Sequence, residues 1–286
     1  EKLGGSVTNP QLTEQYTYSS RWTANAKIKY ERRFDEHSIS SFIAMEQTEN
    51  NSNYFSAFRK NYLSDAIDQL YAGDENNQEA DGSASESARR NYFGRVSYGF
   101  QDKYLLDFNF RYDGSSNFPE DKRWGFFPGV SVGWRISEEE FLRNLTDKIN
   151  NLKLRASYGK MGNDDIDPFQ YLATYSFTSG YFLGADQNSV KGISQGVTPN
   201  PYITWEVAKT LNLGLDGEFW DGLFGVNLDV FKTERSNILT KRNASIPVYT
   251  GLVLPSENIG VVENKGFELA LSHKNTVDQL RYEVTG

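Results

Sequence analysis

The stretch KYLLDFNFRYDGSS, residues 103–116, alternates between two kinds of side chain. Every second residue is large and apolar, and most of the residues between them are charged or carry an amide. The apolar set is Tyr104, Leu106, Phe108, Phe110 and Tyr112. Successive side chains of a β-strand point to opposite faces. This period of two therefore predicts a strand with one polar face and one apolar face that is aromatic at both ends.

The same alternation recurs along the chain, for example in RWTANAKIKYER and NLKLRASYG. We count about ten such segments and read each as a half-buried strand. They cover residues 20–33, 37–47, 91–100, 103–113, 126–136, 151–160, 203–217, 223–234, 262–273 and 279–286.

The connections between these segments are alternately short and long. The short ones lie at 34–37, 101–102, 218–225 and near Asn275, with an intermediate one at 137–150. The long ones are 48–90, 114–125, 161–202 and 235–261. This order predicts an antiparallel up-and-down sheet with tight turns on one rim and long loops on the other.

Two connections carry a further local prediction. In 48–90, the spacing of Phe58, Tyr62, Ile67 and Leu70 predicts a short amphipathic helix, followed by a flexible polar segment over 73–87. The stretch SEEEFLRNL, residues 137–145, is expected to hold a helical turn.

Aromatic residues stand eight apart on three apolar faces. The pairs are Trp22 with Tyr30, Tyr104 with Tyr112, and Phe126 with Trp134. Eight residues of strand span about 26 Å, which a tilt of about 40° reduces to about 20 Å, close to the apolar band of an outer-membrane barrel. Tyr and Trp favour the edges of such a band because the ring is apolar while its O–H or N–H stays hydrated. We therefore predict an all-β, antiparallel transmembrane barrel in which these six residues form the membrane girdle.

Composition excludes several other functions. The 286 residues carry a formal net charge of −8, which argues against a nucleic-acid partner. The chain has no cysteine and two histidines, His37 and His273, so disulfides and thiol catalysis are excluded and we expect no metal site and no cofactor. The sequence has no apolar run of membrane-helix length.

Four blocks of sequence resemble the SusC/RagA type of TonB-dependent outer-membrane transporter of Bacteroidetes. They begin at NYFGRVSYGF, INNLKLRASYG, NPYITWEVAK and ENIGVVENKG, and they cover most of residues 90–275 in the order of that family. The shared motifs are Asp113-Gly114-Ser115-Ser116, Phe127-Pro128, Gly133-Trp134-Arg135, Asn258-Ile259-Gly260 and Asn264-Lys265-Gly266.

The resemblance implies the outer membrane of a Gram-negative bacterium and a barrel of about 22 strands around a plug. Such proteins import glycans or peptides, driven through TonB, beneath a SusD-like surface lipoprotein. No plug and no closing strand are recognised here, so we expect residues 1–286 to be one part of the barrel domain, without the plug and the C-terminal strands. Its partners would then be the bilayer, the lipoprotein, an oligosaccharide or peptide substrate and, through the missing N-terminal part, the TonB complex.

Candidate functional residues fall into two further sets. Charged residues on the polar faces are expected to face the lumen: Arg95, Asp107, Arg111 and Arg155. Aromatic residues in the loops are candidates for ligand contact: Tyr54, Trp124, Tyr181 and Tyr249. Packing within loops or girdle is the alternative role for this second set.

Other functions remain as alternatives. A soluble β-sandwich, such as a carbohydrate-binding module, would also show alternation and aromatic residues. GVSVG, residues 129–133, fits the nucleophile-elbow pattern of hydrolases, but Ser131 sits inside an alternating strand, so we expect no enzyme. The acidic loops around 162–167 and 74–86 lack the spacing of a calcium-binding loop and read as polar loops.

Overall fold

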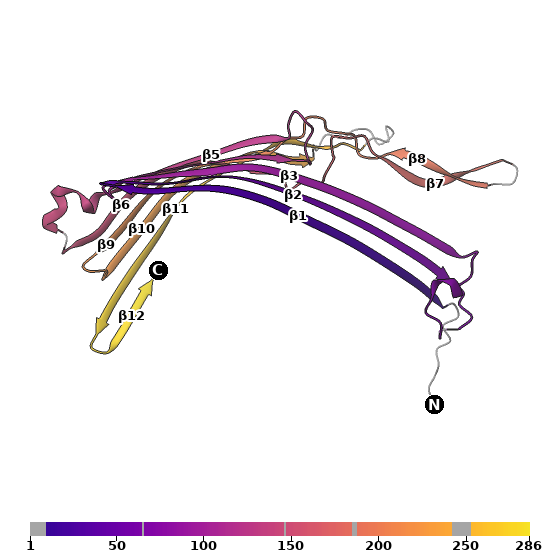
Figure 1. The fold of residues 1–286 in the computed structure, drawn as a ribbon, viewed down its shortest axis with the longest axis horizontal. Coiled ribbons are helices and arrows are strands. Elements are labelled where there is room, and N and C mark those ends of the chain that lie inside the picture. Colours follow the sequence, from indigo (N-terminus) through magenta and orange to yellow (C-terminus); the bar gives the residue numbers. More distant parts are fainter. Residues whose placement is uncertain (1–9, 65, 146, 185–187, 242–252) are drawn as a thin grey trace. The chain divides into compact units, whose positions relative to one another are not determined.

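The computed structural model describes residues 10–64, 66–145, 147–184, 188–241 and 253–286. Ten strands form one antiparallel sheet in which neighbours in space are also neighbours along the chain, apart from a hairpin that leaves the sheet between β6 and β9 (Figure 1). The ten strands are β1 (Gln11–Phe34), β2 (His37–Lys60), β3 (Gln78–Phe100), β4 (Tyr104–Ser115), β5 (Trp124–Arg135), β6 (Ile149–Asn163), β9 (Glu206–Phe219), β10 (Phe224–Lys241), β11 (Ser256–Val277) and β12 (Leu280–Thr285). All ten predicted strands are present.

The sheet does not close. β1 and β12 stand at its two ends, and each has one neighbour in the strand order. An open sheet with this up-and-down order is what a part of a larger barrel presents, so the predicted fold class is confirmed.

Two predictions for residues 48–90 are wrong. Phe58 lies in β2 rather than in a helix, and the helical structure there is a single 3-10 turn, η1 (Leu70–Ala72). The polar segment after it becomes a strand at Gln78. Polar residues such as Ser87 pair across the sheet, where Asn50 donates to its hydroxyl at 3.0 Å. Backbone pairing with a neighbouring strand has therefore overridden the local composition.

Two other long connections differ from the prediction. The connection between β4 and β5 is residues 116–123, which is shorter than predicted. The connection 164–205 contains an unpredicted hairpin, formed by β7 (Tyr175–Leu183) and β8 (Asn188–Gln195). The predicted helical turn in 137–145 is confirmed by two 3-10 helices, η2 (Ile136–Glu138) and η3 (Glu140–Leu145). None of the helices in the described ranges is long and apolar enough to cross a bilayer.

The tight turns have left-handed backbone conformations. Gln101 and Asp102, the central residues of the turn between β3 and β4, have φ of 53° and 54°, and Asp221 and Gly222, the central residues of the turn between β9 and β10, have φ of 54° and 82°. Such turns match the twist of the paired strands and need φ > 0 at both central residues. Asp35 and Asp278, at the other two short connections, also have positive φ. The predicted alternation of short and long connections is present except around β5, where the connection before the strand, 116–123, is shorter than the one after it, 136–148.

Contacts divide the chain into two units. One contains the residues up to Ala24 and Gln47–Ala88, and the other contains Asn25–Glu46 and Arg89–Gly286. The second unit has a small core near the long connections, where Phe118, Phe127, Ile203 and Trp205 pack together. The indole of Trp205 also donates to the Arg123 carbonyl at 3.2 Å.

Outside this core, most large apolar side chains of the described strands are exposed. Phe126, Val132 and Leu213 are 49–55% exposed. A sandwich buries one face of each sheet against the other, and here the only sheet besides the main one among the described residues is the two-stranded β7–β8 hairpin. The β-sandwich alternative is therefore wrong.

Candidate functional site

The register of the strands assigns each residue to one of two faces. Residues that stand opposite each other in an antiparallel pair point to the same side. One row of such partners is polar and crosses β4, β5, β6 and β9: Asp107, Ser131, Ser157 and Asn212. The next row over the same strands is apolar: Leu106, Val132, Ala156 and Leu213. We call these two sides the polar face and the apolar face.

Arg155 organises the centre of the polar face. Its Nη2 lies 2.6 Å from Oδ2 of Asp229, its Nη1 lies 2.7 Å from Oδ1 of the same residue, and its Nε lies 3.0 Å from Oδ2 of Asp216. A two-pronged guanidinium–carboxylate contact is among the stronger hydrogen-bonded pairs in proteins. Asn227 donates to the second oxygen of Asp216 at 2.8 Å. One cation therefore joins β6, β9 and β10 through two carboxylates.

Gly214 gives the Arg155 side chain its space. It stands opposite Arg155 in the β6–β9 register. A Cβ atom at this position would lie 2.5 Å from Cζ of the guanidinium, closer than real Cβ contacts allow. The glycine therefore lets the arginine lie flat across β9 toward Asp229.

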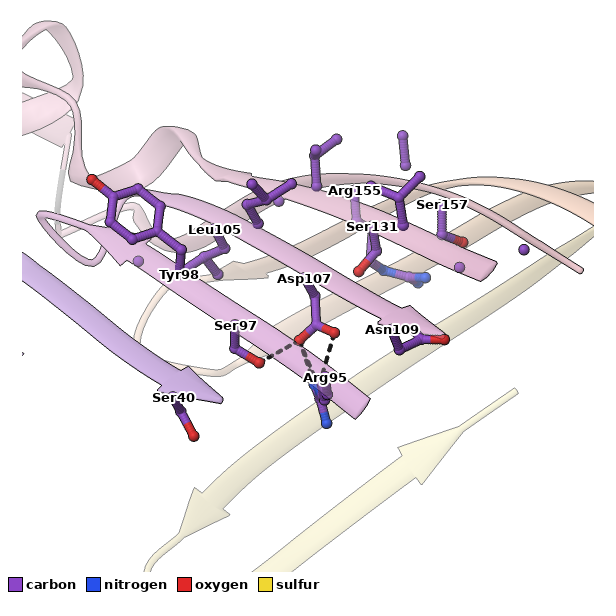
Figure 2. A pocket seen from close by; sticks show the side chains of 18 of the residues that line it. Ser40, Arg95, Ser97, Tyr98, Leu105, Asp107, Asn109, Ser131, Arg155 and Ser157 are labelled. Carbon is purple, nitrogen blue, oxygen red and sulfur yellow. Dashed lines mark hydrogen bonds and ion pairs between the residues drawn. The ribbon is translucent and has the colours of Figure 1, made fainter. Parts of the chain in front are cut away.

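Arg95 and Asp107 form a second ion pair on the polar face. Nη2 of Arg95 lies 2.5 Å from Oδ2 of Asp107, and the hydroxyl of Ser97 donates to the same oxygen at 2.7 Å. Figure 2 shows these three side chains converging. Arg111, the third predicted lumen arginine, pairs with Asp113 at 2.9 Å and lies over the Phe93 ring at 5.0 Å. Each predicted lumen residue therefore already has a partner within the wall.

The polar face is hollowed beside these residues. A space of about 1130 Å³ extends from β1 and β2 to β9, and its lining includes Arg95, Asp107 and Arg155. Ser131, Ser157 and Asn212 add hydroxyl and amide groups to the same wall. Figure 2 shows the labelled side chains of this surface. The surface offers hydrogen-bond donors and acceptors. Among the described residues, no cluster of three metal-ligating side chains is present on it or elsewhere.

The other unit has a similar polar ladder between β1 and β2. Its cross-strand hydrogen bonds join Ser19 with Ser52, at 2.9 Å, and Thr23 with Thr48, at 3.1 Å. Tyr54, a predicted ligand-contact residue, follows Ser52 by two positions and so shares its face. Trp22 lies on the opposite face, where its indole donates to Glu49 at 3.2 Å.

The six predicted girdle residues are all exposed, between 37% and 55%. Tyr104 and Trp134 stand opposite each other near the short-turn rim. Both donate to the same oxygen of Glu139, at 2.6 and 2.9 Å. Lys103 lies 3.6 Å from the other oxygen. These hydrogen bonds, with that of Tyr104 the largest contribution, lower the pKa of Glu139.

The other ligand-contact candidates have separate environments. Trp124 stacks on Tyr112 with ring centroids 4.8 Å apart, and so joins the apolar face. Tyr181 lies in β7 opposite Val190. Tyr249 lies outside the described residues.

Asn258 is a structural residue whose role the sequence pattern did not reveal. Its side-chain nitrogen donates to the carbonyls of Thr204 and Asn237, at 2.9 and 2.8 Å, and its oxygen accepts from the Thr204 N–H at 3.0 Å. It thereby fixes the segment that carries Ile203 and Trp205 to β10 and β11. The shared Asn258-Ile259-Gly260 motif marked the position. The contacts of Asn258 with Thr204 and Asn237 are evident only from the fold.

Comparison with known proteins gives the family. The sequence profile described as TonB dependent receptor-like, beta-barrel matches residues 3–285. The chain belongs to this family. Proteins of this family are barrels of the Gram-negative outer membrane, as the sequence predicted.

Named relatives come from Bacteroidetes. TonB-dependent receptor P3 of Formosa agariphila is 30% identical over 97% of the chain, which covers 27% of that protein. TonB-dependent receptor SusC of Bacteroides thetaiotaomicron is 34% identical over 71% of the chain and 20% of its own length. The chain thus spans less than a third of these relatives.

Solved structures show the same fold. The RagAB peptide transporter superposes with a TM-score of 0.81 over 96% of the chain and 30% of the transporter chain, at 22% identity. A further structure, of the RagAB peptide importer in its closed-closed state, gives a TM-score of 0.78 over 97% of the chain and 31% of that chain, also at 22% identity. The predicted SusC/RagA resemblance is confirmed.

Proposed function

We propose that the whole protein imports oligosaccharides or peptides across the outer membrane, energised through TonB, and that this chain is part of the barrel wall and not an enzyme. The observation that carries this proposal is the two-faced sheet. Its polar face bears ion pairs around Arg95 and Arg155 and a hollow, and its apolar face is exposed. A barrel wall between lipid and a wet lumen needs such a sheet.

The polar face is assigned to the lumen. Arg95, Asp107, Arg111 and Arg155 then lie on the inner wall, where their ion pairs keep the charges neutralised in place. Hydroxyl groups in the lining of the hollow, such as those of Ser131 and Ser157, are available to bond the plug or a passing substrate.

The apolar face is assigned to lipid, with the six aromatic residues as its girdle. On β4 the band runs from Tyr104 to Tyr112, whereas on β9 it runs from Phe219 to Leu211. Tyr104 shares a register row with Leu215, so the band on β9 is displaced by four residues toward the short turns. Where strands tilt by about 40°, the level of a flat membrane moves by about one residue from each strand to the next. The displacement supports a tilted wall, and we assign Trp124 to the girdle as well.

Membership of the family supports a proposal for the partner and for the class of substrate. We infer that a SusD-like lipoprotein covers the long-loop rim, and that Tyr54, Tyr181 and Tyr249 are the aromatic residues available for ligand contact. The RagAB structure is named as a peptide transporter, which supports a peptide as one proposed substrate class. The resemblance to the SusC/RagA type keeps an oligosaccharide as the other proposed class.

Cysteine labelling tests the assignment of the faces. The chain has no cysteine, so Ser131→Cys and Val132→Cys, adjacent in β5, are a matched pair in a cysteine-free form of the full-length protein. We expect a membrane-impermeant maleimide to modify the first variant, and only a lipid-soluble maleimide to modify the second. Equal reaction of both with the impermeant reagent would contradict the proposal.

Uptake tests the activity. Cells with and without the gene are offered fluorescent oligosaccharides and peptides, before and after the proton-motive force is collapsed. We expect one of the two classes to accumulate in a gene- and energy-dependent way, and a surface lipoprotein to co-purify with the barrel. A full-length protein that dissolves without detergent would refute the transporter interpretation.

A further inference from the structure

Six charged residues lie on the apolar face of β6, β9, β10 and β11, immediately beyond the apolar band. We call them the outward charge patch. One register row contains Lys160, Lys209, Glu234 and Glu263. The next row on the same face, two residues nearer the apolar band, contains Lys232 and Lys265 beside Tyr158 and Leu211. The long connections lie at this end of the strands, and in outer-membrane barrels the longer loops are the extracellular ones. The patch therefore stands at the outer edge of the lipid-facing surface.

The pairing within the patch is unusual because like charges stand opposite each other. Lys160 is opposite Lys209, Lys232 is opposite Lys265, and Glu234 is opposite Glu263. Directly opposed like charges destabilise a sheet. Such an arrangement is consistent with a bound counter-charge that neutralises the lysines.

Internal ion pairs neutralise only part of the patch. Lys232 lies 2.7 Å from Glu263, while Lys209–Glu234 and Lys265–Glu263 are longer, at 3.6 and 3.7 Å. Four lysines face two glutamates, and within the described ranges Lys160 has no ion-pair partner. The lysine side chains of these pairs are 41–77% exposed. The patch keeps a net positive charge that an anion can reach.

An apolar hollow adjoins the patch on the same face. It has a volume of about 790 Å³, and Trp134, Leu154, Ala156, Leu213 and Val230 are among its lining residues. Ala156, Leu213 and Val230 form the neighbouring row on the same face, two residues from the row of Lys232. Two residues of strand span about 7 Å, so the hollow and the lysines lie within the reach of one lipid molecule.

We propose that the outward charge patch and the apolar hollow together bind one phosphorylated, multiply acylated glycolipid of the outer leaflet, of the lipid A type. The lysines hold its phosphates, and an acyl chain occupies the hollow. Lysines at an anionic membrane surface contribute attraction of this kind, and buried methylene groups add the hydrophobic part. The proposal rests on the lipid-facing assignment of the apolar face made above.

Native mass spectrometry of the full-length protein in detergent tests the proposal, with bisphosphorylated lipid A as the probe. We expect K160Q/K209Q/K232Q/K265Q to weaken binding by at least about tenfold, since each lysine near an anionic lipid surface contributes about fivefold. The matched control K27Q/K29Q/K122Q/K274Q removes four lysines outside the patch and should bind as the wild type does.

Three further variants or ligands sharpen the result. E234Q/E263Q should bind more tightly, because it removes the negative charges beside the phosphates, whereas it would only lose ion pairs if the patch were purely structural. Ala156→Trp, which fills the hollow, should weaken binding of the acylated lipid. Lipid A without phosphates should bind no better to the wild type than to the lysine variant.

The opposite results would overturn the proposal. These are equal binding by the two quadruple variants, equal binding of phosphorylated and dephosphorylated lipid, or full competition by inorganic phosphate, which would indicate a site for the free ion. A heat-modifiable electrophoretic mobility confirms that each variant barrel is folded. Failure of lipid binding by a protein that still fractionates with the outer membrane refutes this inference alone, whereas absence from that fraction refutes the proposed function.

Discussion

The indole N–H of Trp134 donates a hydrogen bond to the carboxylate of Glu139, with 2.9 Å between Nε1 and Oε1. Trp134 is the penultimate residue of β5, and Glu139 lies between the two 3-10 helices that follow it. Tyr104, from β4, donates to the same oxygen. A carboxylate in the connection after β5 thus fixes two aromatic residues of the proposed girdle.

This contact predicts a pH-dependent stability. Hydrogen bonds to the carboxylate lower the pKa of Glu139, so it loses a proton more readily in the folded chain. The stabilisation is complete above the ordinary glutamate pKa of about 4.3 and is lost as the pH falls through the lower folded value. We expect Glu139→Gln to unfold at a lower temperature than the wild type at pH 7, and the difference to shrink below about pH 4. Thermal unfolding of the full-length protein in detergent measures it.

The neighbouring Glu140 supplies the control for Glu139. It is exposed and lies in the same connection. Glu140→Gln should leave the unfolding temperature unchanged at both pH values. An equal loss in both variants would show that the connection tolerates neither change and that the shared carboxylate has no special role.

Arg155 and Asp229 are predicted to be energetically coupled. Arg155→Ala leaves Asp216 and Asp229 facing each other without a cation, and the two are only 13–26% exposed. We expect a loss of about 1–3 kcal/mol in the free energy of unfolding, because hydrogen bonds to charged groups are worth that much when partly exposed. Arg155→Ala/Asp229→Asn should lose less than the sum of the single changes.

Denaturant unfolding of the four proteins in this double-mutant cycle gives the coupling energy. Arg235→Ala is the comparison, since that arginine is 57% exposed and contacts Glu206 at 3.3 Å. It should cost less than about 1 kcal/mol. Additive single changes at Arg155 and Asp229 would contradict the network.

Asn258 is predicted to hold the loop that carries Ile203 and Trp205. Asn258→Ala removes three hydrogen bonds to main-chain groups of Thr204 and Asn237. At about 1 kcal/mol each, the loss should be about 2–3 kcal/mol, confined to this part of the structure. Hydrogen exchange over residues 199–205 should quicken, while that of β4 stays slow. Asn264→Ala, at an exposed position of β11, is the control and should change neither.

The sequence predicted those features that depend on alternation along a strand. The ten strands and the two faces follow from local side-chain order, because a strand exposes that order directly. The membrane girdle remains a prediction from the same order. The helix around Phe58 was wrong since a spacing that suits a helix can also occur in a strand that gains its stability from neighbours. The partners of Arg155 could not be predicted, because Asp216 and Asp229 reach it only through the register of β6, β9 and β10. The role of Glu139 could not be predicted either, because it depends on how the 3-10 helices place this residue beside Tyr104 and Trp134.

Gly214 tests the close approach of Arg155 most directly. A methyl group there would meet the guanidinium at 2.5 Å, so Gly214→Ala must push the arginine away from Asp229 or shift the strand. We expect a loss of about 1–3 kcal/mol, typical of overpacking, measured by denaturant unfolding in detergent. Gly159, in β6, is the matched control, because a Cβ atom there would have its nearest neighbour at 3.8 Å. Gly159→Ala should therefore be neutral or slightly stabilising, since alanine restricts the unfolded chain. Equal losses at both positions would indicate a general intolerance of side chains on this face and would contradict a specific role for Gly214.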